Sequence, residues 1–374
     1  MAIRVLHVVD AMNRGGAETM LMNLFREIDK SKVQFDFLVH TEKKGAYEEE
    51  IEALGGKVYR ISKFKGINFI SYIKQLKNIL KETEGNNIIH GHIGSSAAIY
   101  LSMAKRHGYF TIAHSHNTAP KNIHLKNILF QIMSYPTRYI ADYFFACGID
   151  AGKDRFGSKI IKSKKFQVLN NAIESGKFIF DENIRRKKRK EIGVSNKFII
   201  GHIGRFEEQK NHEFIIDIFN EIYKENNEAV LLLVGKGSLY KKIYEKVVQL
   251  QLENVVIFTG LREDISELLQ AMDVFVFPSY FEGLPVTVIE AQASGLKCVL
   301  SDTITKEVDI TQNIEYISLN KKPKEWAKAI LEYRNNYNRE NMSNIINEKG
   351  YDIKTTSKWL EEFYLKNNKH KKGN

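Results

Sequence analysis

Two glutamates separated by seven residues mark the segment in which the sequence points most directly to chemistry. Glu282 stands in a loop after an apolar run, and Glu290 falls a little over one turn into the helix that follows. Gly283 allows the backbone to turn, and amides next to Leu284 lie near the positive end of that helix. A carboxylate on each side of an anion site suits a sugar nucleotide, whose phosphates bind amides and whose hydroxyls bind carboxylates. An exposed helix position is the alternative for Glu290, but its apolar neighbours favour a buried helix in which a lone charge needs a partner.

Two cations frame an earlier loop of the same kind. Arg205 and Lys210 follow the apolar run Phe198–Ile203 and precede a helical pattern. Two cations beside a helix N-terminus suit a pyrophosphate-binding site, because the cations and the helix end all attract negatively charged phosphates. A pair of solvated surface cations is the alternative in a sequence this basic.

Four histidines lie at the ends of two predicted strands, in two pairs with one residue between the members. His90 and His92 form the first pair, and His114 and His116 form the second. Alternation along a strand places both members of a pair on one face. A zinc site is one reading, but no helical H-E-x-x-H or paired cysteines accompany the histidines, so we expect no metal. Hydrogen bonding to a polar ligand is the preferred reading, and His90, inside its strand, also fits a core histidine.

Gly15 and Gly16 stand between the first predicted strand and a helix. Glycine at this place lets a ligand approach the backbone, although a tight turn alone also explains the pair. The dinucleotide fingerprint G-x-G-x-x-G is absent, and the near match that begins at Gly235 has Tyr240 in the position of the third glycine. The sequence therefore argues against a dehydrogenase.

Composition sets the outer limits. The chain has 374 residues, 56 Lys and Arg against 45 Asp and Glu, and a net charge of +11. Hydrophobic residues make up 43% and charged residues 27%, which excludes a disordered or fibrous chain. Two cysteines are too few for a disulfide scaffold. No apolar run reaches the roughly 18 residues of a membrane span, and no signal peptide is visible, so we expect a cytoplasmic protein. The charge favours an acidic partner: nucleic acid, a phosphorylated substrate or anionic lipid.

Strand and helix patterns alternate along the chain, which predicts parallel sheets joined by right-handed crossovers. The expected strands are Ile3–Asp10, Phe35–His40, Lys57–Ile61, Ile88–His92, Phe110–His114, Tyr143–Cys147, Phe198–Ile203, Ala229–Val234, Val255–Thr259, Val274–Pro278 and Cys298–Ser301. The fold class is α/β, with two doubly wound Rossmann-like sheets facing each other across a cleft. We expect domains at residues 1–172 and 173–352. The wholly basic stretch Arg185–Lys190 predicts a solvated surface. The tail Trp326–Leu365 is expected to be largely helical.

The glycine pair, the strand-end histidines, Arg205 with Lys210, the Gly235-Lys236-Gly237 turn and the Glu282-to-Glu290 segment occur together in one order. In that order the chain resembles the retaining glycosyltransferases of family 4, also called group 1, which have the GT-B fold. Asn170–Glu174 resembles the hinge motif of that family, with alanine and glutamate in place of the usual glycine and aspartate. The resemblance covers nearly the whole chain.

The resemblance implies a role for each matching residue. Arg205 and Lys210 would bind the donor diphosphate and stabilise the leaving group, Glu290 would hold the ribose, and Glu282 would contact the donor sugar. The other implied contacts are Gly283 and Leu284 on the donor, Gly16 on a phosphate or the acceptor, His114 or its neighbour His116 beside the reacting sugar, and Gly15, His92 and His116 on the acceptor. The resemblance also implies that the last helix, 353–374, crosses back onto the first domain, with Trp359 and Phe363 as anchors.

The expected activity is transfer of a sugar from a nucleotide-sugar, with UDP as the expected nucleotide, to a saccharide or lipid-linked saccharide in polysaccharide biosynthesis. The chain contains no Asp-x-Asp motif, so we expect no metal requirement and no other cofactor. Two alternatives remain: a sugar-nucleotide epimerase of the same architecture, and a nucleic-acid-binding protein, for which no recognisable motif is present. The basic, apolar run Lys121–Arg138 fits either a helix on an anionic membrane surface or a core helix.

Overall fold

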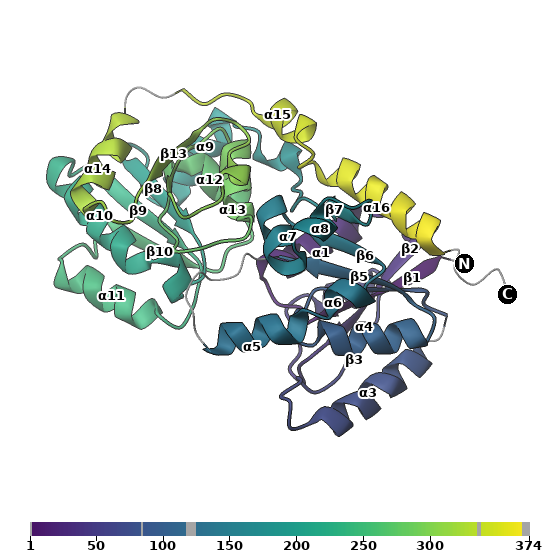
Figure 1. Ribbon diagram of the computed structural model, residues 1–374. Coiled ribbons are helices and arrows are strands. Elements are labelled where there is room, and N and C mark those ends of the chain that lie inside the picture. Colours follow the sequence, from purple (N-terminus) through teal and green to yellow (C-terminus); the bar gives the residue numbers. More distant parts are fainter. Residues whose placement is uncertain (1, 84, 117–124, 335–337, 369–374) are drawn as a thin grey trace. The chain divides into compact units, whose positions relative to one another are not determined.

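The computed structural model describes residues 2–83, 85–116, 125–334 and 338–368, with the backbone alone for 125–129 (Figure 1). The chain divides into two compact units. Unit 1 comprises Met1–Ile173 and Gly350–Asn374, and unit 2 comprises Glu174–Lys349. The boundary falls within the Asn170–Glu174 stretch.

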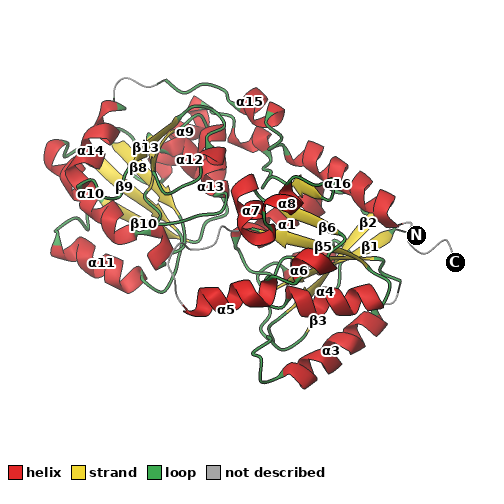
Figure 2. Cartoon of the chain, in the orientation of Figure 1, coloured by secondary structure: helices red, strands yellow, loops and turns green. Residues whose placement is uncertain are grey.

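The described part of unit 1 is built on a parallel sheet of seven strands in the order β3-β2-β1-β4-β5-β6-β7. Its strands are β1 (Ile3–Val9), β2 (Val33–Val39), β3 (Val58–Arg60), β4 (Ile88–Gly91), β5 (Phe110–Ser115), β6 (Tyr143–Ala146) and β7 (Phe166–Val168). The central strands β1 and β5 are largely buried along their length because helices cover both faces of the sheet (Figure 2).

The helices of unit 1 separate onto the two faces according to the alternation of side chains along the strands. They are α1 (Gly16–Glu27), α2 (Glu48–Ala53), α3 (Phe69–Glu82), α4 (Ala97–Arg106), α5 (Leu125–Ser134), α6 (Thr137–Ile140), α7 (Ile149–Phe156), α8 (Ser158–Ile161) and α16 (Ile353–Asn367). Val5 and Val9 of β1 pack with α1 and α16, whereas Leu6 and Val8 pack with α3 and α4.

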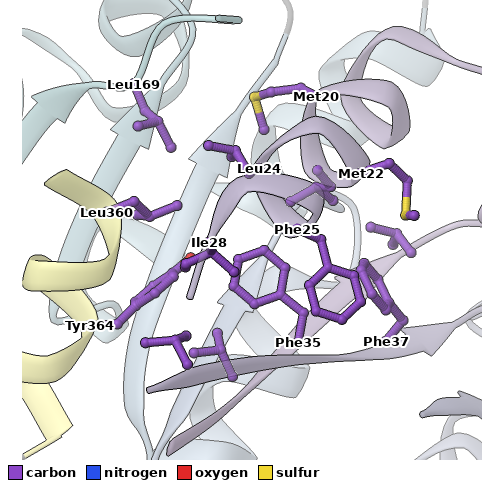
Figure 3. Packing of buried hydrophobic residues seen from close by; sticks show 14 of the residues in the cluster. Met20, Met22, Leu24, Phe25, Ile28, Phe35, Phe37, Leu169, Leu360 and Tyr364 are labelled. Carbon is purple, nitrogen blue, oxygen red and sulfur yellow. The ribbon is translucent and has the colours of Figure 1, made fainter. Parts of the chain in front are cut away.

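The last helix of the chain, α16, is part of the core of unit 1. Leu360 and Tyr364 are fully buried against Phe25 and Phe35, as Figure 3 shows. The expected anchors Trp359 and Phe363 stand one residue earlier on the helix. Both contact unit 1: the ring centroid of Trp359 lies 5.9 Å from that of Phe145, and the ring centroid of Phe363 lies 4.7 Å from that of Tyr143. Trp359 is 37% exposed and Phe363 is partly buried, so Leu360 and Tyr364 are the more deeply buried residues of the helix. The helix ends at Asn367, and residues 369–374 lie outside the described residues.

The described part of unit 2 is built on a six-stranded parallel sheet in the order β10-β9-β8-β11-β12-β13. Its strands are β8 (Phe198–Ile203), β9 (Ala229–Val234), β10 (Val256–Gly260), β11 (Val274–Phe277), β12 (Lys297–Ser301) and β13 (Ile314–Ile317).

Helices again cover both faces of this sheet. The α-helices are α9 (Glu182–Glu191), α10 (His212–Glu225), α11 (Tyr240–Gln249), α12 (Ile265–Ala271), α13 (Val286–Ala293), α14 (Pro323–Glu332) and α15 (Ser343–Glu348), and the 3₁₀ turns are η1 (Ser175–Phe178), η2 (Glu208–Lys210) and η3 (Lys306–Val308). Residues of α10, α11 and α14 share one apolar cluster with β8 and β9.

The tail Trp326–Leu365 is largely helical, as expected, and its helices are the separate elements α14, α15 and α16. One expectation about the second half is corrected by the structure. The basic stretch Arg185–Lys190 is not a solvated face: Lys188 and Arg189 are 4% and 8% exposed. Arg185 and Arg189 each donate to Asp273 at 2.5 Å, and Lys188 pairs with Asp264 at 2.7 Å. Carboxylates from elsewhere in unit 2 therefore compensate the buried charges of α9.

Candidate functional site

The predicted donor-binding residues of unit 2 follow two neighbouring strands. β8 pairs directly with β11, with Ile200 opposite Val274 and Gly201 opposite Phe275. The loops that leave the carboxyl ends of these strands therefore begin side by side, which is where ligands bind in open parallel sheets. Arg205 belongs to the β8 loop, and Glu282 belongs to the β11 loop.

Hydrogen bonds join these two loops into one structure. The backbone N–H of Tyr280 donates to the carbonyl of Gln209 at 2.9 Å, and Nε2 of Gln209 donates to the carbonyl of Phe281 at 2.8 Å. Asn211 Nδ2 donates to the carbonyl of Pro278 at 3.2 Å. Asn211 has a φ of +56°, a left-handed conformation that asparagine tolerates and that turns the chain from η2 into α10.

Lys210 and Glu282 form an ion pair between the two loops. Lys210 Nζ lies 2.7 Å from Glu282 Oε1, and the side chains are 15% and 9% exposed. The ammonium also lies 4.5 Å from the ring centroid of Phe277, at the end of β11. The ion pair fixes the directions of the ammonium and the carboxylate. The ammonium suits an anionic group of a ligand, and the carboxylate suits the hydroxyl groups next to it.

Arg205 differs from Lys210 in having no such restraint. It is exposed, and its guanidinium makes no hydrogen bond or ion pair with any described residue. Its backbone carbonyl accepts from the N–H of Glu207 at 2.7 Å, which fixes the start of the loop. The guanidinium is therefore available to an anion without first breaking a salt bridge.

The glycines at Gly235 and Gly237 serve the packing of the β8 loop. A Cβ at Gly235 would lie 2.1 Å from the carbonyl oxygen of Gly204, and one at Gly237 would lie 2.4 Å from that of Phe206. The loop after β9 thus needs glycine to lie against the loop after β8. This requirement explains the near match to a dinucleotide fingerprint without a dinucleotide.

Glu290 lies on α13, which begins at Val286 and has Pro285 as its N-cap. The side chain of Glu290 is partly buried, and desolvation raises the pKa of its carboxyl to about 8. No described residue hydrogen-bonds to this carboxyl. At neutral pH it is therefore mostly protonated, and it can both donate to and accept from the hydroxyls of a ligand.

The structure thus joins two of the predicted donor residues directly. Lys210 and Glu282 are bonded, whereas neither Arg205 nor Glu290 hydrogen-bonds to that pair within the described residues. Gly283 and Leu284 are buried in the loop between the two carboxylates in sequence.

The predicted glycines of unit 1 stand at the start of α1. Gly15 is the N-cap, and its carbonyl accepts from the N–H of Thr19 at 2.8 Å. A Cβ at Gly15 would meet the flexible side chain of Glu18, and one at Gly16 would meet no atom within 4 Å. The packing of the protein therefore does not require glycine at position 16, which leaves approach of a ligand as the stronger of the two readings.

The strand-end histidines form one cluster with a fifth member. His7 of β1 lies in register with His90 of β4, and His92, His114 and His116 complete the group. Ring centroids are 4.4 Å apart for His90 and His92 and 4.1 Å apart for His114 and His116. Burial lowers the pKa of all five, to about 3 for His7, about 4 for His116 and well below the usual value for the others. The cluster is therefore neutral at physiological pH and acts through hydrogen bonds.

Two chains of hydrogen bonds run through the cluster. In the first, His7 Nδ1 lies 3.1 Å from His92 Nε2, and His92 Nδ1 lies 2.8 Å from His116 Nε2. In the second, the hydroxyl of Tyr364 lies 2.7 Å from His90 Nδ1, and His90 Nε2 lies 3.2 Å from His114 Nδ1. A neutral imidazole has one donor and one acceptor nitrogen, so each chain carries its protons in a single direction.

Tyr364 sets the direction of the second chain. Its hydroxyl is buried on α16, has no other hydrogen-bond partner among the described residues, and would be left unsatisfied if it only accepted. The hydroxyl therefore donates to His90 Nδ1, and His90 Nε2–H donates to His114 Nδ1. His114 must then carry its proton on Nε2, an atom that is buried and without a partner in the described structure. This N–H can donate to an oxygen of a ligand.

Among the described residues of unit 1, these histidines are the groups that could hold a metal ion. Ligand atoms lie within 4.8 Å of one another in the group His7, His90 and His92 and in the group His92, His114 and His116. Most of these nitrogens already face one another at hydrogen-bond distance, so a metal would have to displace the bonds within the cluster. The geometry thus favours hydrogen-bonding chains, and the absence of a metal requirement stays a prediction.

Sequence reasoning missed two members of this cluster. His7 could have been found, because it occupies the same alternating face of the first strand as Val5 and Val9. Tyr364 carried no comparable signal, since its contact with His90 depends on how the last helix docks 274 residues further along the chain. The choice between His114 and His116 stays open, since both have a buried nitrogen without a partner in the described structure.

The chain has two units, each built on a parallel sheet with candidate ligand-binding loops at the strand ends. This is the architecture of the GT-B class of glycosyltransferases. Across 96% of this chain and 99% of the other, the fold matches the Anabaena protein HepE, solved with UDP and glucose, with a TM-score of 0.79 at 17% identity. This likeness shows the fold.

Sequence comparison identifies the family. The family model described as Glycosyltransferase Family 4 matches residues 14–173. The model described as Glycosyl transferases group 1 matches residues 197–336. EpsF of Bacillus subtilis is 37% identical over 87% of this chain and 86% of its own length. The chain belongs to glycosyltransferase family 4.

Two further relatives carry more detailed names. The Staphylococcus aureus capsular polysaccharide biosynthesis glycosyltransferase CapH is 27% identical over 97% of this chain and 99% of its own. An Escherichia coli UDP-Gal:alpha-D-GlcNAc-diphosphoundecaprenol alpha-1,3-galactosyltransferase is 27% identical over 62% of this chain and 63% of its own.

Proposed function

We propose that this glycosyltransferase moves a sugar from a UDP-sugar to a saccharide or lipid-linked saccharide in the assembly of a polysaccharide. The observation that carries the donor half is the bonded pair Lys210 and Glu282 on two joined loops, with the unrestrained Arg205 on the same β8 loop. The names of CapH and of the Escherichia coli relative support the polysaccharide and the lipid-linked acceptor.

The cations of unit 2 act on the leaving group. When the bond between the sugar and the diphosphate breaks, its electron pair stays on the diphosphate oxygen, and negative charge grows there. Arg205 and Lys210 stabilise this charge more in the transition state than in the bound substrate, which lowers the barrier. Lys210, held by Glu282, and Arg205, unpaired among the described residues, can together take the part that a divalent metal plays elsewhere, so the proposed reaction needs no metal.

The remaining donor groups orient the substrate. Glu282 accepts from a sugar hydroxyl while Lys210 holds its other side, and the carboxyl of Glu290 binds the ribose hydroxyls. Transfer proceeds with retention: the acceptor hydroxyl bonds to the anomeric carbon on the face that the diphosphate leaves, and its proton passes to the departing phosphate oxygen.

The test is turnover by the purified protein with a panel of UDP-sugars and lipid-linked or free saccharide acceptors. Transfer should persist in excess chelator, and Arg205→Ala should lower kcat/KM by at least a hundredfold, because it removes charge stabilisation from the transition state. Loss of activity in chelator that manganese restores would contradict the metal-independent mechanism. Arg186, an exposed arginine on α9, offers Arg186→Ala as the matched control.

An epimerase of the same architecture is the second candidate for this site. It would convert the donor sugar without any acceptor, so product analysis in reactions that lack acceptor separates the two activities. A nucleic-acid-binding role predicts instead a salt-dependent shift of labelled DNA at physiological salt.

We also propose that the protein works at an anionic membrane surface. No helix among the described residues is long and apolar enough to cross a bilayer. The run Lys121–Arg138, expected from sequence to face a membrane or the core, begins outside the described residues, and its exposed members include Ile132 and Tyr135, at 64% and 49%.

A further inference from the structure

The most exposed large apolar residues of the described structure stand at the start of α3. Ile67 is 96% exposed and Ile70 is 84% exposed, and Phe69 between them is 50% exposed. Isolated apolar side chains are common on protein surfaces, but three large apolar residues within four positions, all at least half exposed, are not. α3 lies beside α4 in unit 1 (Figure 1). Ile70 is the second residue of α3, and Ile67 lies in the loop just before the N-cap Asn68.

This exposed end is an ordered feature of the fold. The side chain of Asn68 accepts from the N–H of Lys65 at 2.8 Å and donates to the carbonyl of Lys63 at 2.9 Å. Phe64 packs against Tyr72 with ring centroids 5.2 Å apart, which ties the loop to the buried face of α3. The loop between β3 and α3 is thus held so that Ile67 projects into solvent.

The outer face of α3 continues as a row of positive charge. Ile70, Lys74, Lys77 and Lys81 follow one another at spacings of four, three and four residues, so they form one stripe along the helix. The opposite face carries Tyr72, Leu76 and Leu80, which are buried in the core of unit 1.

The lysines of this stripe lack acidic partners. Lys65, Lys74, Lys77 and Lys81 are exposed and make no ion pair with any described residue, whereas Lys63 pairs with Asp10 at 3.3 Å. The segment 61–82 contains five lysines and one glutamate. The surface therefore combines an apolar tip with unneutralised positive charge, the pattern of an interfacial helix on an anionic membrane.

We propose that the face formed by Ile67, Ile70, Lys74, Lys77 and Lys81, called here the α3 face, docks unit 1 on an anionic lipid bilayer. The isoleucines enter the boundary between headgroups and acyl chains, and the lysines contact lipid phosphates. Charge alone would also suit nucleic acid, but a phosphate backbone offers no environment for two protruding isoleucines. This proposal deepens the proposed function, since it places a specific surface at the membrane where a lipid-linked acceptor resides.

Vesicle co-sedimentation of the full-length protein tests the proposal without any sugar substrate. The protein should partition onto phosphatidylglycerol vesicles and at least tenfold less onto phosphatidylcholine vesicles. The double variant Ile67→Ser/Ile70→Ser should lower the partition coefficient at least tenfold at unchanged melting temperature, because both side chains are exposed. The variant Lys74→Gln/Lys77→Gln/Lys81→Gln should remove most of the preference for the anionic lipid.

Matched variants on other surfaces serve as controls. Val248→Ser/Leu261→Ser removes two apolar side chains of unit 2 that are 44% and 56% exposed, and it should bind vesicles as the native protein does. Ile132→Ser/Tyr135→Ser, called here the α5 variant, alters the competing surface at the end of α5 and the residue after it, and it should reduce binding less than the α3 variant.

Three results would overturn the proposal. Binding that is unchanged in the Ile67→Ser/Ile70→Ser variant shows that the apolar tip does not enter the bilayer. Binding that disappears only in the α5 variant transfers the contact to that helix. Equal binding to duplex DNA and to vesicles, both insensitive to the isoleucine changes, shows a general polyanion surface. Because no step of this experiment involves transfer of a sugar, its failure leaves the proposed glycosyl transfer intact, and the reverse also holds.

Discussion

A glycine that the fold does not need is informative, and Gly16 is one. A Cβ at this position meets no atom within 4 Å, and the backbone of Gly16 does not adopt a positive φ. Alanine also suits a helix better than glycine does, by about 0.5–1 kcal/mol at an interior position. A methyl group here therefore harms the protein only if a ligand must approach the backbone.

For Gly16→Ala we expect an unchanged or slightly higher melting temperature and a kcat/KM at least tenfold lower. Gly176, in η1 of unit 2, is the matched control, since a Cβ there also meets nothing within 4 Å. Gly176→Ala should leave both quantities unchanged. Native kcat/KM in Gly16→Ala would remove Gly16 from the ligand site.

Glu290 is a second residue that lowers the stability of the fold at neutral pH, which favours a role in ligand binding. Its pKa of about 8 exceeds the ordinary value of 4.5. Between these two pH values the folded protein therefore holds a proton that the unfolded chain has already released. Stability from this group is present at low pH and is lost as the pH rises through about 8. At pH 7 the carboxyl lowers the free energy of unfolding by about 3 kcal/mol relative to a side chain that does not titrate.

Glu290→Gln should therefore be as stable as the native protein at pH 4.5 and increasingly more stable toward pH 8, as measured by urea unfolding. The same change should weaken UDP binding, because the amide does not reproduce the carboxyl contacts with the ribose. Glu253→Gln, at an exposed position, is the control. Equal stabilities of Glu290→Gln and native protein across this range would show that the carboxyl is not sheltered.

At the scale of elements, the sequence predicted the central strands and one edge strand of each sheet, β3 and β10, but missed the other edge strand of each. β7 and β13 were not expected, and each stands at one end of its sheet. Residues of an edge strand are only half covered, so Phe166–Val168 and Ile314–Ile317 lack the long apolar run that marked β1 or β9. The buried strands carry that run because two layers of helices cover them.

The candidate site was predictable residue by residue but not contact by contact. The types and spacing of Lys210 and Glu282 pointed to a donor site, yet their 2.7 Å pairing depends on the adjacency of β8 and β11. The basic stretch of α9 was misjudged for the same reason, because Asp273, the partner of Arg189, lies 84 residues away in the sequence. Long-range partners decide whether a charge is solvated or buried, and a local pattern does not contain them.

The docking of α16 on β4 and β5 makes Tyr364 a positioning residue for His114. Tyr364→Phe removes the hydroxyl that donates to His90 Nδ1, so His90 no longer has to donate to His114. We expect the proton of His114 to shift from Nε2 toward Nδ1, which ¹⁵N chemical shifts of labelled histidine would detect, and kcat to fall severalfold.

Tyr72→Phe is the control for that change. Tyr72 is also fully buried, and its hydroxyl lies 3.2 Å from Nε2 of His40, outside the five-histidine cluster. Both substitutions remove one buried hydrogen bond and should cost about 1–2 kcal/mol. Only Tyr364→Phe should alter the tautomer of His114, and an identical histidine spectrum in both variants would refute the directed chain.

At the scale of the whole molecule, the end of the chain completes the unit in which the chain begins. Leu360 and Tyr364 are fully buried in the core of unit 1, and the carboxylate of Glu361 pairs with Lys32 at 2.9 Å. The N–H of Ile353 donates to the carbonyl of Ile173 at 3.0 Å, where the chain leaves unit 1. The sequence of unit 1 up to residue 173 therefore lacks part of its own core.

Truncation after Tyr351 removes α16 and should destabilise unit 1 while leaving unit 2 folded. Loss of two fully buried large side chains costs about 2–5 kcal/mol each, a large part of the stability of a domain this size. Calorimetry should show one transition moving to markedly lower temperature and one in place, and limited proteolysis should cleave within residues 1–173 first. Truncation after Asn368 keeps the whole helix and should melt as the native protein does. A normal transition for unit 1 without α16 would mean that its seven-stranded sheet is stable with that face uncovered, contrary to the burial of Phe25 and Phe35 beneath the helix.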